Sequence, residues 1–294
     1  MTARSWLFVP GDSERKLAKG AASVADALIV DLEDSVAPAS LQAARGQAAS
    51  FLAAQTGKGG PELWVRINAL ASGLALADLA AVVPAGPVGI VLPKAESAAD
   101  VVTLGNYLSA LEVAAGAVEG STRILAIATE TPGALFTLGG YAPAHARLAA
   151  LTWGAEDLAA ALGAAGNREP GGAYAYPFLL ARALCLAGAA AAGVAGVDTV
   201  FTDFRDGAGL QAEARAARRD GFVGKLAIHP DQVPIINRAF TPDADEVARA
   251  ERIVAAFAAA PGAGVVGIDG RMIDMPHLKQ ARRILAAASK GRTP

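Results

Sequence analysis

Short runs of apolar residues recur along the chain, and each run ends in polar or turn-forming residues. Between them lie alanine-rich stretches whose apolar positions repeat with helical spacing. Near-continuous apolar strands that alternate with helices are typical of a parallel sheet covered on both faces. The predicted strands lie in the segments SWLFVPG (5–11), ALIVDLED (27–34), LWVRIN (63–68), GIVLPKAE (89–96), ILAIATE (124–130), LAALTWGAED (148–157), DTVFTDF (198–204) and KLAIHPDQ (225–232).

The rhythm of these segments predicts the fold. Eight strand–helix units within about 235 residues fit a (β/α)8 barrel, in which helices surround eight parallel strands. An open, doubly wound sheet is the alternative, but no Gly-x-Gly-x-x-Gly sequence follows the first strand, which counts against it. We therefore predict an α/β protein with a TIM-barrel catalytic domain over residues 1–238 and a C-terminal helical extension over residues 239–294.

The predicted extension contains two helices and a glycine-rich segment between them. Thr241 and Pro242 have the residue types of a helix cap and a first helical residue, ahead of an amphipathic pattern over residues 244–260. Residues 261–276, PGAGVVGIDGRMIDMP, predict a mobile loop, and residues 277–290 predict a last short helix.

Composition narrows the class of protein. Hydrophobic residues make up 53% of the 294 residues, which is ample for a large core, and a net charge of −2 gives no sign of a nucleic-acid or membrane partner. The one cysteine, Cys185, is predicted to be a buried core thiol. The apolar stretches are too short for a signal peptide or for the ~20 residues of a membrane span, so a cytoplasmic location is expected.

Charged residues gather where the predicted strands end, and active sites of such barrels lie at the carboxyl ends of the strands. Buried charges are costly unless they are paired or bind a ligand, so the pattern predicts a shared polar pocket. Glu130 and Asp157 follow the fifth and sixth strands and suit a hard cation such as Mg²⁺, which one or two carboxylates usually hold. Salt bridges to Arg66 or Lys94 are the alternative interpretation. The full set is Asp31, Glu33, Asp34, Arg66, Asn68, Lys94, Glu96, Glu130, Glu156, Asp157, Asp203 and His229.

Seven stretches, in order and covering nearly the whole chain, carry a family resemblance. They are LFVPGDSERKLAKG, ADALIVDLEDSV, WVRIN, ILAIATETPGAL, LTWGAEDLAAALG, GKLAIHPDQV and DGRMIDMPHLKQARR. With these motifs the chain resembles the citrate lyase β-subunit-like proteins of the HpcH/HpaI aldolase superfamily, which include malyl-CoA and citramalyl-CoA lyases. The resemblance implies a TIM barrel, usually a homotrimer, that uses Mg²⁺ to cleave or form a carbon–carbon bond beside a thioester.

The resemblance also implies roles for individual residues. Glu130 in TETPG and Asp157 in WGAEDL match the metal-ligand positions, which also places Glu130 beside the substrate. Arg66 in VRIN matches the arginine that binds the substrate carboxylate, and its planar fork suits a bidentate contact. Asp274 in MIDMP matches an acid–base aspartate that the C-terminal lid contributes to the site of a neighbouring subunit. Asp269 in the same loop is the competing candidate.

Other residues have two interpretations each. Among Asp31, Glu33 and Asp34, we favour Glu33 as a residue that assists catalysis through water, with a structural network as the alternative. The roles of the other two stay open. Lys94 either meets a substrate or coenzyme A phosphate or neutralises neighbouring acids. His229 matches a structural position of the family pattern. The basic residues Arg215, Arg218, Arg219 and Lys225 are interpreted as a solvated helix face rather than a coenzyme A site.

The expected function is a Mg²⁺-dependent carbon–carbon lyase. Its substrates would be a 3-hydroxyacyl-CoA such as malyl-CoA or citramalyl-CoA, and its products an α-keto acid and an acyl-CoA. A malyl-CoA thioesterase and a citrate lyase β subunit acting on citryl-acyl carrier protein are the alternatives, and a non-catalytic binding protein is a third. The extended tail with MIDMP favours a stand-alone coenzyme A enzyme over the citrate lyase complex.

Overall fold

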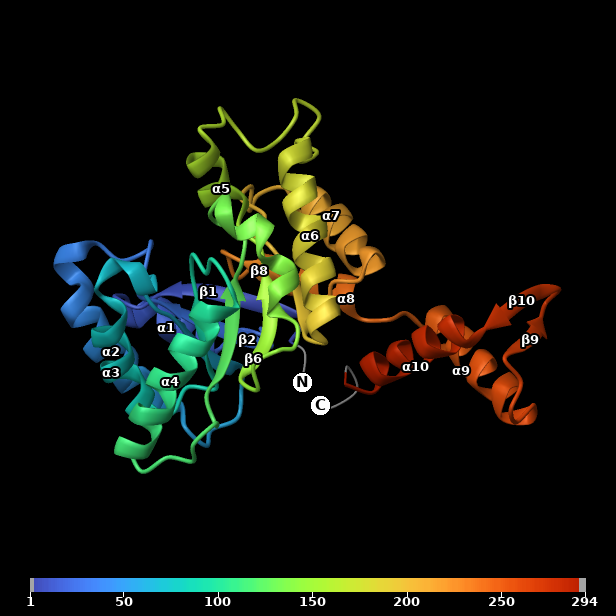
Figure 1. Ribbon diagram of the computed structural model, residues 1–294, viewed down its shortest axis with the longest axis horizontal. Coiled ribbons are helices and arrows are strands. Elements are labelled where there is room, and N and C mark those ends of the chain that lie inside the picture. The colour runs from blue at the N-terminus through green and yellow to red at the C-terminus, as the bar shows by residue number, and fades with distance from the viewer. Residues whose placement is uncertain (1–2, 291–294) are drawn as a thin grey trace. The chain divides into compact units, whose positions relative to one another are not determined.

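The computed structural model describes residues 3–290 and forms a closed barrel of eight parallel strands, which confirms the predicted (β/α)8 fold with C-terminal helices (Figure 1). Each strand pairs with the next along the chain, and the eighth pairs with the first. The strands are β1 (Ser5–Pro10), β2 (Ala27–Asp31), β3 (Glu62–Arg66), β4 (Gly89–Leu92), β5 (Arg123–Ile127), β6 (Leu148–Thr152), β7 (Ala195–Asp198) and β8 (Gly224–Ala227).

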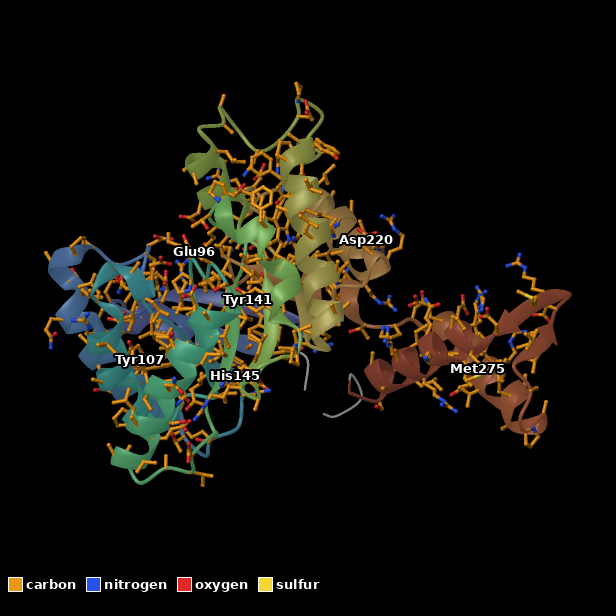
Figure 2. The ribbon with its side chains drawn as sticks, viewed as in Figure 1. Glu96, Tyr107, Tyr141, His145, Asp220 and Met275 are labelled. Carbon is orange, nitrogen blue, oxygen red and sulfur yellow. The ribbon has the colours of Figure 1, made fainter. Side chains whose placement is uncertain are left out.

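Helices follow the strands and cover the barrel. They are α1 (Glu14–Ala21), α2 (Leu41–Gln55), α3 (Ala75–Val82), α4 (Ala98–Ala114), α5 (Ala155–Leu162), α6 (Tyr176–Ala192), α7 (Gly207–Asp220) and α8 (Gln232–Phe240). Local sequence fixes their ends: α4, for example, begins at a capping box in which Ser97 accepts from the Ala99 N–H and Asp100 accepts from the Ser97 N–H. Arg182 of α6 donates to Asp220 at the end of α7 (2.8 Å), which ties these two helices together. Figure 2 labels the position of Asp220.

The position predicted for the seventh strand was wrong. The strand lies at Ala195–Asp198, and most of the predicted segment, residues 198–204, follows it. Asp198 was predicted to begin the strand but ends it. This acidic residue can be 1% exposed because it forms ion pairs of 3.0 Å with Lys225 and with Arg182. Its charge is neutralised by partners that are distant in sequence.

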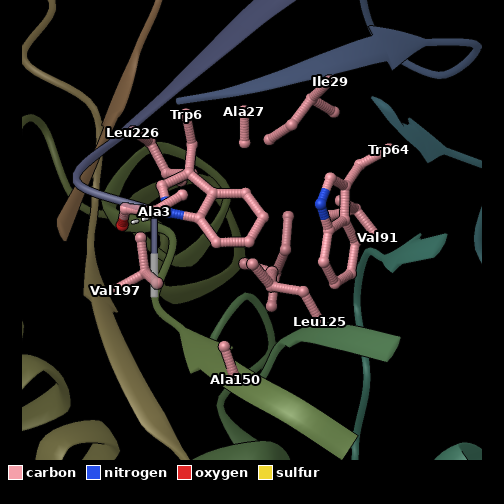
Figure 3. Packing of buried hydrophobic residues seen from close by; sticks show 11 residues of the cluster. Ala3, Trp6, Ala27, Ile29, Trp64, Val91, Leu125, Ala150, Val197 and Leu226 are labelled. Atoms are coloured by element: carbon pink, nitrogen blue, oxygen red, sulfur yellow. Dashed lines mark hydrogen bonds between the residues drawn. The ribbon is translucent and has the colours of Figure 1, made fainter. Parts of the chain in front are cut away.

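Large side chains fill the interior of the barrel (Figure 3). Trp6 and Trp64 are buried and contact edge to face, with ring centroids 5.0 Å apart. Gly89 leaves the room that the Trp64 ring needs, because a Cβ there would overlap the ring. The barrel is therefore a packed core and not a pore, which leaves its ends for chemistry. Cys185 is buried, as predicted, and no helix among the described residues is long and apolar enough to cross a membrane.

The chain divides into two compact units, with the boundary between Asn237 and Arg238. The second unit contains α9 (Ala244–Ala259), β9 (Val265–Ile268), β10 (Arg271–Asp274) and α10 (Met275–Lys290), packed around a small apolar core. Two local predictions were wrong here. The cap of α9 is Asp243, which accepts from the Glu246 N–H (2.8 Å), and the predicted loop is a β-hairpin. Its turn is Asp269-Gly270, both with positive φ, a pair that favours tight hairpins.

A buried ion pair beneath β5 and β6 predicts a pH-dependent stability. Glu112 is 1% exposed, lies 2.7 Å from Arg147 and accepts from the Thr122 and Gly120 N–H groups. Burial alone would raise the pKa of Glu112, but these partners lower it to about 2. The folded pKa is below the unfolded one, so the pair stabilises the fold above the ordinary glutamate pKa. This stabilisation is lost as the pH falls towards 2.

We expect Glu112→Gln to lower the free energy of unfolding at pH 7 by about 3–5 kcal/mol, because it leaves the buried Arg147 charge without a carboxylate to neutralise it. Urea denaturation at pH 7 and at pH 3 measures the effect, and the difference from wild type should shrink at the lower pH. Glu119→Gln removes the same charge from an exposed neighbouring position and should change little. An equal loss for both variants would contradict the prediction.

Candidate active site

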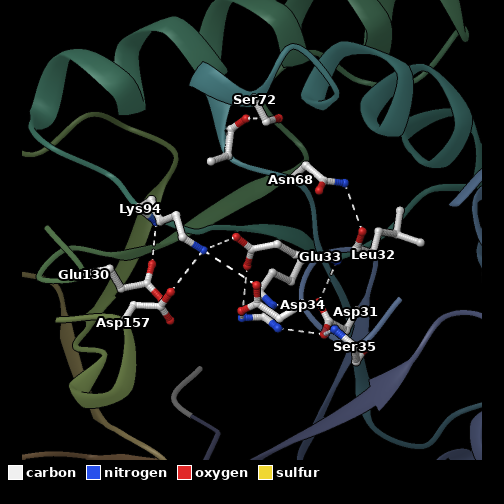
Figure 4. A network of polar contacts seen from close by, with 12 residues as sticks. Asp31, Leu32, Glu33, Asp34, Ser35, Asn68, Ser72, Lys94, Glu130 and Asp157 are labelled. Atoms are coloured by element: carbon white, nitrogen blue, oxygen red, sulfur yellow. Dashed lines mark hydrogen bonds and ion pairs between the residues drawn. The ribbon is translucent and has the colours of Figure 1, made fainter. Parts of the chain in front are cut away.

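A cluster of charged side chains converges at the carboxyl ends of β2 to β6 (Figure 4). We call it the strand-end cluster. Each member ends a strand or lies within a few residues of a strand end, so barrel closure brings together residues that are far apart in sequence. The cluster consists of Asp31, Glu33, Asp34, Arg66, Lys94, Glu130 and Asp157.

Arg66 is held by Asp31 through a bidentate contact. Nε lies 2.6 Å from Oδ1 and Nη2 lies 2.7 Å from Oδ2, across neighbouring strands whose register pairs these residues. Nη1 lies 3.3 Å from Asp34 and 3.1 Å from Glu33 Oε2, the latter without hydrogen-bond geometry. Burial raises the pKa of Asp31, but the contacts with Arg66 outweigh it and hold that pKa below its usual range. Asp31 therefore fixes the plane of the guanidinium.

Lys94 links the part of the cluster around Arg66 and Glu33 with the part around Glu130 and Asp157. Its Nζ lies 2.5 Å from Glu33, 3.4 Å from Asp157 and 3.8 Å from Asp34, and its backbone N–H donates to Glu130 at 2.5 Å. Its backbone has φ +51°, a left-handed conformation uncommon for residues other than glycine. These contacts favour the interpretation that Lys94 neutralises neighbouring acids. Burial raises the pKa of Glu33 despite its cationic neighbours.

Glu130 and Asp157 lie side by side in Figure 4. Glu130 is 4% exposed, whereas Asp157 at the start of α5 has a side chain that is 35% exposed. Burial, and after it the charge of Asp157, raise the pKa of Glu130 to about 8. Gly154 allows this approach, because a Cβ there would lie 2.7 Å from Glu130 Cγ. The charge of Asp157 thus disfavours ionisation of Glu130.

The residues of the strand-end cluster fit a hard divalent cation. Five carboxylates face two cations, and the one hydrogen bond to the Glu130 carboxylate in the described structure comes from the Lys94 N–H. No group of three or more His, Cys, Asp or Glu ligands is assembled among the described residues. Mg²⁺ usually takes one or two carboxylates and completes its octahedron with water and substrate oxygens, so two acidic ligands suit it.

A supporting network escaped the sequence analysis. Asn68 donates to the Leu32 carbonyl (2.9 Å) and to Asp78 (2.8 Å), and Arg45 donates to the other oxygen of Asp78 (2.7 Å). Asp78 is fully buried. The network holds the segment that carries Glu33. In the sequence, the feature that indicates this network is Asn68, the last residue of the VRIN motif.

Several predicted residues lie outside the cluster. Asp203 is exposed beyond β7, Glu156 accepts from Asn167, and His229 stacks on Phe204 with centroids 5.0 Å apart. The placement of Lys225 on a solvated helix face was wrong. It is fully buried in β8, 3.0 Å from Asp198 and 2.8 Å from Glu213, because these acids compensate its charge.

Asp274 belongs to the second unit, where it ends β10. Its Oδ1 lies 2.5 Å from Nδ1 of His277, and this contact holds the pKa of Asp274 below its usual range. Asp269, the competing candidate, pairs with Arg252 at 3.0 Å. The catalytic role of Asp274 stays a prediction.

Comparisons with known proteins agree with this fold and cluster. A family model described as HpcH/HpaI aldolase/citrate lyase matches residues 4–230. Citrate lyase subunit beta of Haemophilus influenzae is 37% identical over 290 residues, which cover 98% of this chain and 97% of that protein. The mitochondrial citramalyl-CoA lyase of Rattus norvegicus is 33% identical over 297 residues, which cover 97% of this chain and 86% of that protein.

Solved structures are similar as well. CitE from Mycobacterium tuberculosis in complex with magnesium, acetoacetate and coenzyme A has a TM-score of 0.78 at 34% identity, covering 97% of this chain and 98% of that chain. The citrate lyase beta subunit from M. tuberculosis complexed with oxaloacetate and magnesium has a TM-score of 0.67 at 35% identity, covering 82% of this chain and 98% of that chain.

A closed eight-stranded barrel with a charged cluster at its strand ends defines a TIM-barrel enzyme. The chain belongs to the HpcH/HpaI aldolase/citrate lyase family and is a lyase of the citrate lyase β-subunit-like type. The resemblance that the sequence motifs indicated is thereby confirmed.

Proposed function

We propose that the protein is a Mg²⁺-dependent carbon–carbon lyase that cleaves or forms a 3-hydroxyacyl-CoA such as malyl-CoA or citramalyl-CoA. The observation that carries the proposal is that Glu130, which follows β5, and Asp157, which follows β6, lie side by side (Figure 4). Lys94 and Glu33 link these two acids to Arg66. The family relationship supports it, since a similar structure contains magnesium, acetoacetate and coenzyme A.

Glu130 and Asp157 would hold the Mg²⁺ ion. When bound, the ion would act as a Lewis acid that polarises the hydroxyl or keto oxygen of the substrate. Arg66 would bind the carboxylate of the α-keto-acid half. Asp31 occupies its Nε–Nη2 edge, so Nη1 would face a substrate on the cluster side, and the substrate carboxylate would replace the 3.3 Å contact of Nη1 with Asp34. Asp31 would keep the guanidinium in plane, so little freedom is lost on binding.

In cleavage, the hydroxyl proton leaves, the carbon–carbon bond breaks, and the electron pair moves to the thioester as an enolate. Asp274 would deliver a proton to the enolate carbon, and in condensation it would remove that proton. Glu33 would accept the hydroxyl proton through water. We further propose a homotrimer in which Asp274 of one copy serves the site of a neighbour, with residues 262–274 of the C-terminal extension acting as a lid that excludes water.

A citrate lyase β subunit is the second candidate, because the H. influenzae protein of that name aligns over almost its whole length. Its substrate would be carried by an acyl carrier protein. Turnover of free coenzyme A thioesters by the isolated chain would separate the two candidates in favour of the stand-alone lyase.

The test is an assay of the isolated chain with malyl-CoA and citramalyl-CoA. We expect acetyl-CoA together with glyoxylate or pyruvate, and a loss of at least about 100-fold when a chelator removes the metal. Release of free malate and coenzyme A would indicate the thioesterase instead. Full turnover with excess chelator would refute the metal role.

A further inference from the structure

Lys94 is the one residue that contacts both sides of the strand-end cluster. Its Nζ lies 2.5 Å from Glu33 on the Arg66 side and 3.4 Å from Asp157 on the Glu130 side. Lysine is ordinarily protonated at neutral pH, so a cation already lies against one of the two acids assigned to the metal. The left-handed backbone of Lys94 directs the side chain and the backbone N–H to opposite members of the cluster.

We propose that the Lys94 ammonium competes with the divalent cation for Asp157 and so sets the metal affinity of the site. This inference rests on the proposed metal site. When the metal binds, Lys94 leaves Asp157 and keeps only its contact with Glu33. Glu33 would keep the lysine because its contact with Nζ is short (2.5 Å). Asp157 would release the lysine because its contact with Nζ is longer (3.4 Å).

Electrostatics gives the sign of the effect. A positive charge within 4 Å of Asp157 repels an incoming cation and occupies a carboxylate oxygen that the cation needs. The two side chains are 32% and 35% exposed, so salt should weaken the effect in part, and the comparison belongs at low ionic strength. Loss of the ammonium should therefore tighten metal binding, whereas loss of a lysine that only stabilises the fold would leave the affinity unchanged or weaken it.

The charge of the Lys94 side chain can be removed without removing the backbone hydrogen bond to Glu130. The hydrogen bond to Glu130 comes from the Lys94 N–H, which any replacement except proline retains. Glu33 keeps Arg66 as a cationic neighbour at 3.1 Å after the lysine is removed. Lys94→Gln removes the charge at similar length, Lys94→Asn suits a positive φ, and Lys94→Arg keeps the charge.

The experiment measures Mn²⁺ binding to the full chain without substrate, by the electron paramagnetic resonance signal of the free ion. We expect Lys94→Gln and Lys94→Asn to bind Mn²⁺ roughly 10-fold more tightly or better than wild type, and Lys94→Arg to stay near wild type. Lys58→Gln removes the same charge from an exposed loop before β3, at the other end of the barrel, and should change nothing. Thermal unfolding identifies any variant that does not fold.

The outcomes separate the inference from the proposed function. Unchanged or weaker binding by both neutral variants, with wild-type binding intact, overturns the inference and leaves the metal site standing. Tighter binding by Lys94→Arg also overturns it, because side-chain shape and not charge would then be responsible. No Mn²⁺ binding by wild type, or undiminished binding by Asp157→Asn, refutes the metal site and the inference with it.

Discussion

Glu130→Gln is expected to abolish metal-dependent turnover, with a loss of at least about 1,000-fold, while the metal-free protein stays at least as stable as wild type. An amide is a poor substitute for a carboxylate ligand of Mg²⁺. Burial and the charge of Asp157 raise the pKa of Glu130 to about 8, so the acid is largely neutral at pH 7, and Gln has nearly the same shape and charge as that form. Turnover should therefore fall, whereas the free energy of unfolding of the metal-free protein should stay the same or rise.

Two measurements on one preparation check this prediction. Thermal unfolding with and without Mg²⁺ should show a stabilising shift for wild type and none for Glu130→Gln, because ligand binding stabilises only the state that binds. Turnover of the best thioester gives the loss of activity. Glu96→Gln, an exposed acid beyond β4 and outside the strand-end cluster, is the matched control and should keep both properties. A magnesium-induced shift that survives in Glu130→Gln would contradict the assignment.

The barrel could be predicted from sequence because its strands are buried on both faces, which leaves a local signature. All five residues of β2 are buried, and the matching apolar run is visible in the sequence. The seventh strand was predicted too late in the sequence because it ends in an acid, Asp198, although it is buried. Lys225, which neutralises that acid, lies 27 residues further along the chain. Periodicity reports burial but not long-range pairing of charge. In the second unit, the Asp269-Gly270 turn signal was present but flanked by strands of only four residues.

The strand-end rule predicted which charged side chains converge, but not which acid pairs with which cation. Asp31 and Arg66 face each other because of the register between β2 and β3, which no single-sequence pattern gives. The bridge through Lys94 depends on a left-handed backbone at a non-glycine residue, which propensities disfavour. The buried Asp78 accepts from Asn68, ten residues earlier in the chain, and helical periodicity does not reveal such a contact. Sequence therefore predicted which charged residues meet, whereas their pairing and orientation needed the structure.

Asp274→Asn is expected to lower kcat by roughly 100- to 10,000-fold, the usual contribution of a positioned general acid–base group, with metal binding unchanged. Asn has a similar shape and retains an oxygen that can face His277, so the hairpin should persist. Asp269→Asn is the matched control from the same hairpin, and its activity should be near wild type. A retained kcat for Asp274→Asn, or an equal loss for both variants, would remove Asp274 from the mechanism.

Mixing two inactive variants tests whether Asp274 serves a neighbouring copy. In a homo-oligomer assembled from both Glu130→Gln and Asp274→Asn chains, some sites would combine Glu130 of one chain with Asp274 of the other. We expect co-expression to restore a measurable fraction of wild-type turnover, although each variant alone is inactive. If each chain supplied its own Asp274, no mixture could contain a complete site, because every chain would lack one of the two groups. Recovery on mixing therefore requires the second unit to act across copies, and its absence would place the acid–base step within one chain.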